Sequence, residues 1–286
     1  MILISIILAL AIERLGARDA HWQIDHYSKR YLKMSQSLLD NNALLKSPFA
    51  FALWALLPAL AIYFLMDFAD FFLFELALNT VLLLICFGCA KPRALYKGYL
   101  NALTRGDSEG ATLYALQLGQ HRTEDQQGGE WVGQTLAWVN FRHYCAVIFW
   151  FVVFGAPGAV MYAVVRSLFD EAQHSEASVL TRRNSVLADM LFWLNWLPAR
   201  ITSFGYLIIG NFSKGTGCWL KYALDFKTPN RKVVTSTALA AEQIEQIEQQ
   251  YAGCTYEATC MMRLVKRNIL FYLALIALLT LFGGLA

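Results

Sequence analysis

The chain has 286 residues, of which 57% are hydrophobic and only 16% are charged. Soluble domains are on average about 45–50% apolar and about 25% charged, so this composition, with a mean hydropathy of +0.41, excludes an ordinary soluble fold. The formal net charge is +3, and the basic residues flank apolar runs without forming a separate basic patch, which argues against nucleic-acid binding. We therefore expect an all-α, polytopic membrane helical bundle whose surroundings are the lipid bilayer.

The N-terminal third contains three apolar segments. Residues 2–12 lack a basic stretch before them and a cleavage site after them, so they predict an uncleaved first helix and not a signal peptide. Residues 16–47 are polar with loosely helical apolar positions, which is typical of a helix on the membrane surface. Residues 48–66 and 71–90 are apolar and joined by a short turn, so they predict an antiparallel pair of spans.

The stretch 143–165 is the most informative part of the sequence. It has no charged residue from Tyr144 to Val165, and about 20 helical residues cross the roughly 30 Å hydrocarbon core of a bilayer. Gly155-Ala156-Pro157-Gly158 lies in its middle, where proline removes a backbone donor and clashes with the preceding turn. Such a break needs neighbouring helices or a wet cavity around it. The stretch therefore predicts a broken span inside a packed bundle.

Two polar regions, 91–142 and 213–268, predict helical inserts between the spans. The first contains a helix capped by Asp107 or Ser108 and a second helix that leads into the broken span. The second contains a short acidic amphipathic segment near 238–250. The remaining apolar segments, 188–212 and 269–285, predict two further spans.

The basic residues predict the topology. Segments 14–47, 91–142 and 213–268 hold six, six and eight Lys or Arg residues, and with six spans all three lie on one side. The positive-inside rule makes that side cytoplasmic and places both termini outside. We expect about six spans or half-spans in a single membrane domain over 1–286 with cytoplasmic inserts. The alternative has four spans, with 2–12 and 188–212 only peripheral to the membrane.

Titratable residues are dense between positions 13 and 26, beside the first apolar helix. Glu13, Asp19 and His21 are candidate ligand-binding residues, because buried carboxylates and histidines can have shifted pKa values and do acid–base or metal work. The alternative is a hydrated ladder of interfacial ion pairs. His21 and His26 are five residues apart, which is not the one-face spacing of a zinc site, so we predict no metal site.

Three further polar residues lie at or inside apolar segments. Asn140 and Arg142 precede the broken span and could meet an anionic ligand, because arginine offers a planar fork of donors; the alternative is an arginine at the lipid interface. Arg200 follows Pro198 inside an apolar run. An ionisable residue in such a run is expensive, which favours a functional site or internal pairing; the alternative is a surface helix on which Arg200 faces lipid headgroups. No residue is identified as catalytic, and no cofactor is identified.

Several motifs resemble those of a known family. The quoted stretches ILALAIERLG, HWQIDHY, ALTRGDSEGAT, WVNFRHYCAVIFW, LNWLPARIT and YALDFKTPN are together similar to the AmpE family of Gram-negative inner-membrane proteins. That family is encoded with the amidase AmpD and linked to β-lactamase induction. The resemblance covers essentially the whole chain. It implies a multi-pass protein of the bacterial inner membrane that acts in cell-wall recycling, with AmpD or other cell-wall enzymes as partners.

A more distant resemblance connects the chain to the CobD and CbiB membrane proteins of the cobalamin pathway, which form adenosylcobinamide phosphate. The shared features are Phe149-Trp150, Gly155-Ala156-Pro157-Gly158, Pro198-Ala199-Arg200 and Pro229-Asn230, and His21 is retained. The chain departs from that family where a helix is acidic or amidic, since it has Gln134, Trp138, Val139 and Arg142 there. The resemblance adds Asn230 to the candidate ligand-binding residues.

Two functions are compatible with these patterns. The first is a signalling or regulatory protein of β-lactamase induction and peptidoglycan recycling that acts with AmpD. The alternative is a membrane-embedded ligase or transferase with a CobD-like site for a phosphorylated or muropeptide-like substrate. In the second case Glu13, His21, Arg142 and Arg200 should converge on one pocket. A transporter is the weakest of the hypotheses, because no repeat symmetry is visible.

Overall fold

A computed structural model describes residues 1–16, 19–41, 47–67, 71–120, 130–174, 179–242 and 256–283. Within these ranges all regular elements are helical, which confirms the predicted all-α class. Most of the predicted turn at 67–70 and of the acidic segment at 238–250 lies outside the described residues, as does Arg18. The described beginning of that acidic segment belongs to the C-terminal end of a helix over Asn230–Glu242.

The chain divides into two compact units. Unit 1 is made of 1–88, 146–195 and 276–286, and unit 2 is made of 89–145 and 196–275. Both units are therefore discontinuous in sequence, and the chain passes between them four times. Unit 2 contains the whole of the predicted insert 91–142 and, in its second segment, the insert 213–268.

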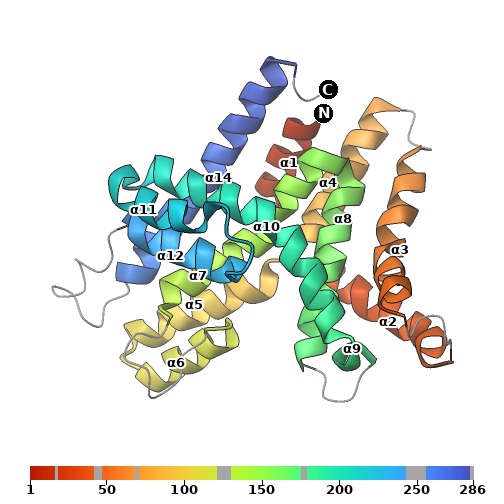
Figure 1. Cartoon of the computed structure of the whole chain (residues 1–286), viewed down its shortest axis with the longest axis horizontal. Coiled ribbons are helices and arrows are strands. Elements are labelled where there is room, and N and C mark those ends of the chain that lie inside the picture. The colour runs from red at the N-terminus through yellow and green to blue at the C-terminus, as the bar shows by residue number, and fades with distance from the viewer. Residues whose placement is uncertain are drawn as a thin grey trace. The chain divides into compact units, whose positions relative to one another are not determined.

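Unit 1 is built around α8 (Ala146–His174). Its other helices are α1 (Ile2–Leu15), α2 (Ile24–Asn41), α3 (Pro48–Asp67), α4 (Phe72–Phe87) and α9 (Val179–Arg182), with a short 3-10 turn η1 (Ala20–Trp22). Helices α2, α3 and α4 contact α8, and α1 lies against α4 (Figure 1). Tyr31 of α2 donates a hydrogen bond of 2.9 Å to the carbonyl of Trp54, and the two rings stack. The broken span is thus surrounded by helices, as predicted.

The break in α8 lies at Gly155, where φ is +67° and ψ is −156°. A residue with a Cβ is strained in that conformation, whereas glycine adopts it freely. A Cβ built on Gly158 would lie 2.3 Å from the carbonyl oxygen of Trp150, so a second glycine is required where the two halves of the helix approach each other. Pro157 follows the break and begins the next helical stretch. These contacts give a physical role to three of the four residues in the Gly-Ala-Pro-Gly motif.

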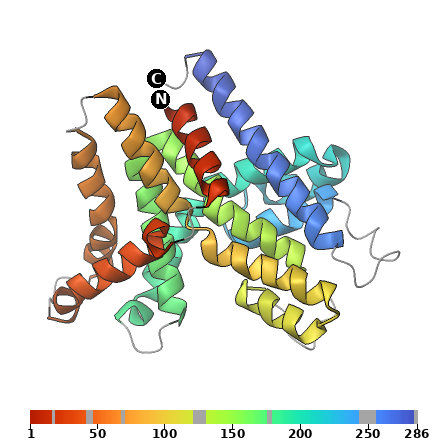
Figure 2. The same cartoon turned by 180° about the vertical axis from the view of Figure 1, so that it is seen from behind.

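Unit 2 contains α5 (Ala90–Thr104), α6 (Ser108–Gln117), α7 (Val132–Asn140), the π-helix η3 (Phe141–Cys145), α11 (Phe212–Ala223) and α12 (Asn230–Glu242). Helices α10 (Asn184–Ile209) and α14 (Tyr256–Leu281) each begin in one unit and end in the other. Helix α5 contacts α6, and α12 contacts both α7 and α11; Figure 2 shows α5 and α6 side by side. The carboxylate of Asp107 accepts from the backbone of Gly110 at 2.8 Å, so Asp107 is the predicted cap of α6.

A hydrophobic cluster holds α5, α6, α7 and α14 together. Its buried members are Ala115, Leu118, Val132, Leu136 and Ala258. Tyr96 and Tyr99 of α5 cover the cluster from one side. Burial of apolar surface stabilises such a cluster by about 25 cal/mol per Å², so the insert 91–142 folds onto the C-terminal part of the chain through this contact.

Three described helical segments are long and apolar enough to cross a membrane: Pro48–Asp67, Val132–His174 and Glu257–Leu281. The bent pair α4 and α5 makes a fourth if it counts as one span. These four are the segments of the four-span alternative. Helix α1 has 14 residues, short of a full crossing, and α10 does not combine the length and apolar composition of these segments. The larger count of about six spans or half-spans stays a prediction.

Candidate functional site

The side chain of Arg200 lies at the centre of a buried polar node in unit 2, which we call the Arg200 node. Its Nη1 donates to the side-chain oxygen of Asn230 and, at 3.1 Å, to the carbonyl of Trp196. Its Nη2 donates to the carbonyl of Asp225 at 2.5 Å. The guanidinium carbon lies 4.7 Å from the centre of the Trp196 ring. One side chain therefore joins α10, the loop after α11 and the start of α12.

Neighbouring groups reinforce the Arg200 node from outside. The Trp219 indole donates to the carbonyl of Arg200 at 3.1 Å, and the rings of Trp196 and Phe226 stack with centroids 4.6 Å apart. Arginine suits this position because its planar fork can donate to several acceptors at once. These contacts are an internal pairing of Arg200, which we expected as one possibility beside a functional site. One of its partners is Asn230, the residue added by the resemblance to the cobalamin family. The Nε of Arg200 is buried without a hydrogen bond.

Asp225 organises the loop that carries the carbonyl bound by Arg200. Its carboxylate accepts from the hydroxyl of Thr228 at 2.5 Å and from the backbone N–H of Lys227 at 2.7 Å. The hydroxyl of Thr228, followed by the Lys227 N–H, holds the pKa of Asp225 below its ordinary value, because both donate to the charged form. The loop is thus fixed by a carboxylate that stays ionised in mild acid.

A second polar cluster lies between α10 and α14, also in unit 2. The hydroxyls of Thr202 and Tyr272 are 2.7 Å apart, and Thr202, Ser203, Tyr206 and Asn268 are all buried. The side-chain oxygens of Ser203, Tyr206 and Asn268 have no hydrogen bond of normal geometry. A Cβ on Gly205 would lie 2.2 Å from the Asn268 oxygen, so this glycine lets α10 and α14 approach closely. Orphaned buried oxygens are costly.

Asn140 and Arg142 lie at the junction of α7 with the π-helix η3. Asn140 is buried, and its side-chain oxygen accepts a weak bond from the thiol of Cys145 at 3.9 Å. Arg142 is half-buried. π-Helical turns are rare and occur often at functional sites. The sequence pattern placed both residues at the start of the span but gave no sign of the π-helix.

Glu13, Asp19 and His21 belong to unit 1. Glu13 is buried in the last turn of α1, whereas Asp19 and His21 are exposed at the turn before α2. The His21 ring meets the His26 ring edge to face at a centroid distance of 5.2 Å. Within the described ranges no group of three or more His, Cys, Asp or Glu residues could hold a metal ion. The cluster predicted from residues 13–26 is thus split between a buried and an exposed part.

The candidate residues therefore fall into two sets. Arg200 and Asn230 are in direct contact, and Asn140 and Arg142 belong to the same unit as that pair. Glu13, Asp19 and His21 belong to the other unit. Convergence of all of them on one pocket stays a prediction, as does a ligand at any of them.

Sequence reasoning missed Arg166, which ends the apolar stretch in α8. Its side chain is among the largest that are fully buried, and its Nη2 donates to the carbonyl of Cys86 in the last turn of α4 at 2.9 Å. A cation at a helix C-terminus is favoured by the helix dipole. The next residue, Ser167, donates to Asp25 of α2 at 2.7 Å. The signal was present in the sequence, because Arg166 is the first charge after a run without any.

These features define an all-helical membrane protein whose buried arginines join helices within each unit. A family model described as "Regulatory signalling modulator protein AmpE" matches residues 1–286. The chain therefore belongs to the AmpE family, as its motifs indicated, and it is a regulatory membrane protein by that membership.

Among curated proteins, the chain is 29% identical over 304 residues to "Protein AmpE" of Shigella flexneri, and all of both chains is covered. It is also 29% identical over 205 residues to "Cobalamin biosynthesis protein CobD" of Chromobacterium violaceum, which covers 70% of this chain and 61% of that protein. A CobD protein of Stutzerimonas stutzeri is 30% identical over 34% of this chain and 31% of its own length. No solved structure matches the chain.

Proposed function

We propose that this chain is a multi-pass protein of the bacterial inner membrane that modulates β-lactamase induction and cell-wall recycling, acting with AmpD. The observation that carries the proposal is the family match over the whole chain, 1–286. Alignment with a curated AmpE protein from end to end supports the same role. An alignment limited to one domain of a longer protein would support this role less than an alignment over both full chains does.

The Arg200 node supports a regulatory role over acid–base catalysis at that position. Arg200 donates to the side-chain oxygen of Asn230 and to the backbone carbonyls of Trp196 and Asp225. A guanidinium held by several acceptors is suited to fixing a conformation. Helix α10, the loop after α11 and α12 would then respond together to a signal that reaches any of them.

The second candidate function is a membrane-embedded ligase or transferase for a phosphorylated or muropeptide-like substrate. The similarity to CobD over 70% of this chain favours it. Asn140 and Arg142, at the start of the π-helix, would then bind the anionic group of the substrate, since arginine matches phosphate and carboxylate geometry. Fold similarity alone does not transfer a reaction, so this function needs a chemical readout.

A deletion strain tests the first proposal. In a Gram-negative host with an inducible β-lactamase and no copy of this gene, we expect induction by a β-lactam, measured by hydrolysis of a chromogenic substrate, to change. Plasmid-borne wild-type protein should restore it. Unchanged induction in the deletion strain would refute the regulatory role. Co-purification of tagged AmpD with the full-length chain from solubilised membranes tests the partner.

Metabolite profiling of the same strains separates the two functions. The enzyme hypothesis predicts that a phosphorylated or muropeptide-like compound accumulates in the deletion strain and in an Arg142→Gln variant of normal membrane abundance. The regulatory hypothesis predicts altered induction with no accumulated compound. A variant at Lys97, an exposed residue of α5, serves as the matched surface control.

A further inference from the structure

Helix α11 presents an apolar and basic face to the outside of unit 2. Phe212, Leu220 and Leu224 are 57%, 62% and 80% exposed, and Phe226 in the following loop is 53% exposed. The opposite face of α11 is buried through Gly215 and Tyr222. An amphipathic helix normally turns its apolar face toward the protein, but here large apolar side chains point away from it. Such an exposed patch marks a contact surface.

The lysines of α11 lie beside this apolar strip. At about 100° per residue, Leu220 and Leu224 are about 40° apart around the helix, and Lys214 and Lys221 are about 20° apart on the adjoining arc. Both lysines are exposed. An apolar strip flanked by lysines is the pattern of a helix that lies in the plane of a membrane interface.

The apolar surface continues from α11 onto α10. The Phe204 and Trp219 rings have centroids 5.3 Å apart, and Phe204 and Ile208 are exposed on α10. At the other end, the exposed Phe226 ring stacks on Trp196. We define the interfacial face as Phe204, Ile208, Phe212, Leu220, Leu224 and Phe226 with Lys214, Lys221 and Lys227. It covers two helices and a loop of one unit.

The charge of this face is positive. Asp225 is the one acidic residue in the sequence 212–232, which contains five Lys or Arg residues. The Asp225 carboxylate, which accepts from the hydroxyl of Thr228 and the backbone of Lys227, offsets one of these charges, and the three exposed lysines Lys214, Lys221 and Lys227 keep the face positive. An anionic surface complements such a face.

We propose that α11 lies in the headgroup layer of the membrane and binds anionic phospholipid there. Leu220, Leu224 and Phe212 enter the upper acyl region, and Lys214, Lys221 and Lys227 bind lipid phosphates. The chain is already a membrane protein with apolar spans, so the bilayer is the surface that this face meets. The assignment is independent of the signalling role and of any reaction, because it uses neither Arg200 nor Arg142.

Hydrogen–deuterium exchange of the full-length protein in lipid nanodiscs tests the proposal. Nanodiscs contain either phosphatidylcholine alone or a mixture with phosphatidylglycerol, and peptides over residues 212–224 report on α11. We expect slower exchange in the anionic nanodiscs than in phosphatidylcholine alone. Adding 0.5 M salt should reduce this difference, because it shortens the Debye length to roughly a few Å and screens the lysines from the lipid phosphates. Each lysine near an anionic surface contributes about fivefold to binding, and two contribute about 25-fold.

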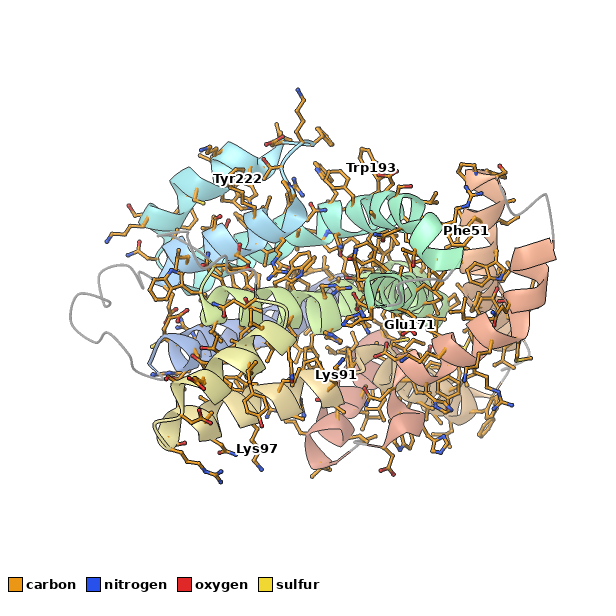
Figure 3. The ribbon with its side chains drawn as sticks, turned by 90° about the horizontal axis from the view of Figure 1, so that it is seen from below. Phe51, Lys91, Lys97, Glu171, Trp193 and Tyr222 are labelled. Carbon is orange, nitrogen blue, oxygen red and sulfur yellow. The ribbon has the colours of Figure 1, made fainter. Side chains whose placement is uncertain are left out.

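The variant Lys214→Gln/Lys221→Gln should lose the lipid dependence. The matched control is Lys91→Gln/Lys97→Gln, which removes the same charge from α5; Figure 3 shows Lys97 of α5 and Tyr222 of α11 on opposite sides of unit 2. The control should keep the wild-type difference between the two nanodiscs. In a second variant, Leu220→Ser/Leu224→Ser, exchange of α11 should rise in both lipids.

Each other outcome overturns the proposal. Equal exchange in both nanodiscs removes the preference for anionic lipid. A lipid effect that persists in Lys214→Gln/Lys221→Gln assigns it to other residues. Equal protection by inorganic phosphate in phosphatidylcholine nanodiscs assigns the site to a free anion, and protection that grows with protein concentration assigns the face to a second copy of the chain.

Discussion

Replacing Asn230 by alanine removes one acceptor from the Arg200 node and leaves the guanidinium buried. A hydrogen bond to a charged group contributes about 1.5–3 kcal/mol, and Arg200 keeps the carbonyls of Trp196 and Asp225. We therefore expect Asn230→Ala to lower the free energy of unfolding by about 2 kcal/mol. Arg200→Met strands three acceptors at once, and we expect a loss of about 3–5 kcal/mol.

The double variant separates the pair from its surroundings. Once Arg200 is methionine, Asn230→Ala no longer removes this hydrogen bond, so it should cost less than it does in the wild type. The coupling energy of the double-mutant cycle should be about 2 kcal/mol, whereas residues without shared contacts are additive within about 0.5 kcal/mol. Asn211→Ala is the matched control, because it removes the cap of α11 at a cost of about 1 kcal/mol and should add to Arg200→Met.

Thermal unfolding of the purified chain in nanodiscs measures these costs. One kcal/mol corresponds to about 2–4 °C in chains of this size range, so Asn230→Ala should lower the midpoint by about 4–8 °C. Additive losses for Asn230→Ala and Arg200→Met, or an unchanged midpoint for Asn230→Ala, would refute the description of the pair as mutually dependent.

Three further outcomes follow from contacts described above. Because the pKa of Asp225 is lowered in the folded state, its ionised carboxylate stabilises the fold fully above the ordinary value of 3.8. This stabilisation is lost as the pH falls through the folded-state pKa. In unfolding scans below about pH 4, the wild type should therefore lose stability that Asp225→Asn does not have to lose. Gly158→Ala should destabilise by about 1–3 kcal/mol through its clash with the preceding half of α8, whereas Gly217→Ala, with no atom within 4 Å, should stabilise by about 0.5–1 kcal/mol; equal effects would contradict the geometry. Glu130→Gln should lower the free energy of unfolding by about 1–2 kcal/mol, because the Glu130 carboxylate binds Arg231 at 2.5 Å in a largely buried pair. If high salt abolished the difference in unfolding midpoint between wild type and variant, the pair would be screened like an exposed one, and the prediction would be wrong.

Local patterns were sufficient for much of the fold. Pro157 between two glycines predicted the break in α8, because proline lacks an N–H whatever surrounds it. Asp107 was one of two predicted caps, since a short acceptor side chain before an apolar helical pattern has few other uses. Both inferences depend on interactions within a few residues, which sequence order displays directly.

Interactions across long sequence separations could not be predicted in the same way. The contact of Arg200 with Asn230 spans 30 residues, and only the family resemblance pointed to Asn230. Arg166 binds a carbonyl 80 residues away, which no spacing rule indicates. Helix α11 lies in a region interpreted as polar, because its few large apolar residues, such as Phe212 and Leu220, are separated by glycines, lysines and hydroxyl residues. A charge in an apolar run shows that a partner is needed, but tertiary packing decides which partner is used.

The order of elements along the chain has a consequence for biogenesis. Helices α2, α3 and α4, which contact α8, all precede it in the sequence. During synthesis from the N-terminus, all three helices emerge from the ribosome before the Gly155 break does. The run from Tyr144 to Val165 can be recognised by the insertion machinery as an ordinary span, and it finds the neighbours that stabilise its broken form already in place. Moving α8 ahead of α3 by circular permutation would leave the broken span waiting for its neighbours, and we expect that chain to be degraded more rapidly.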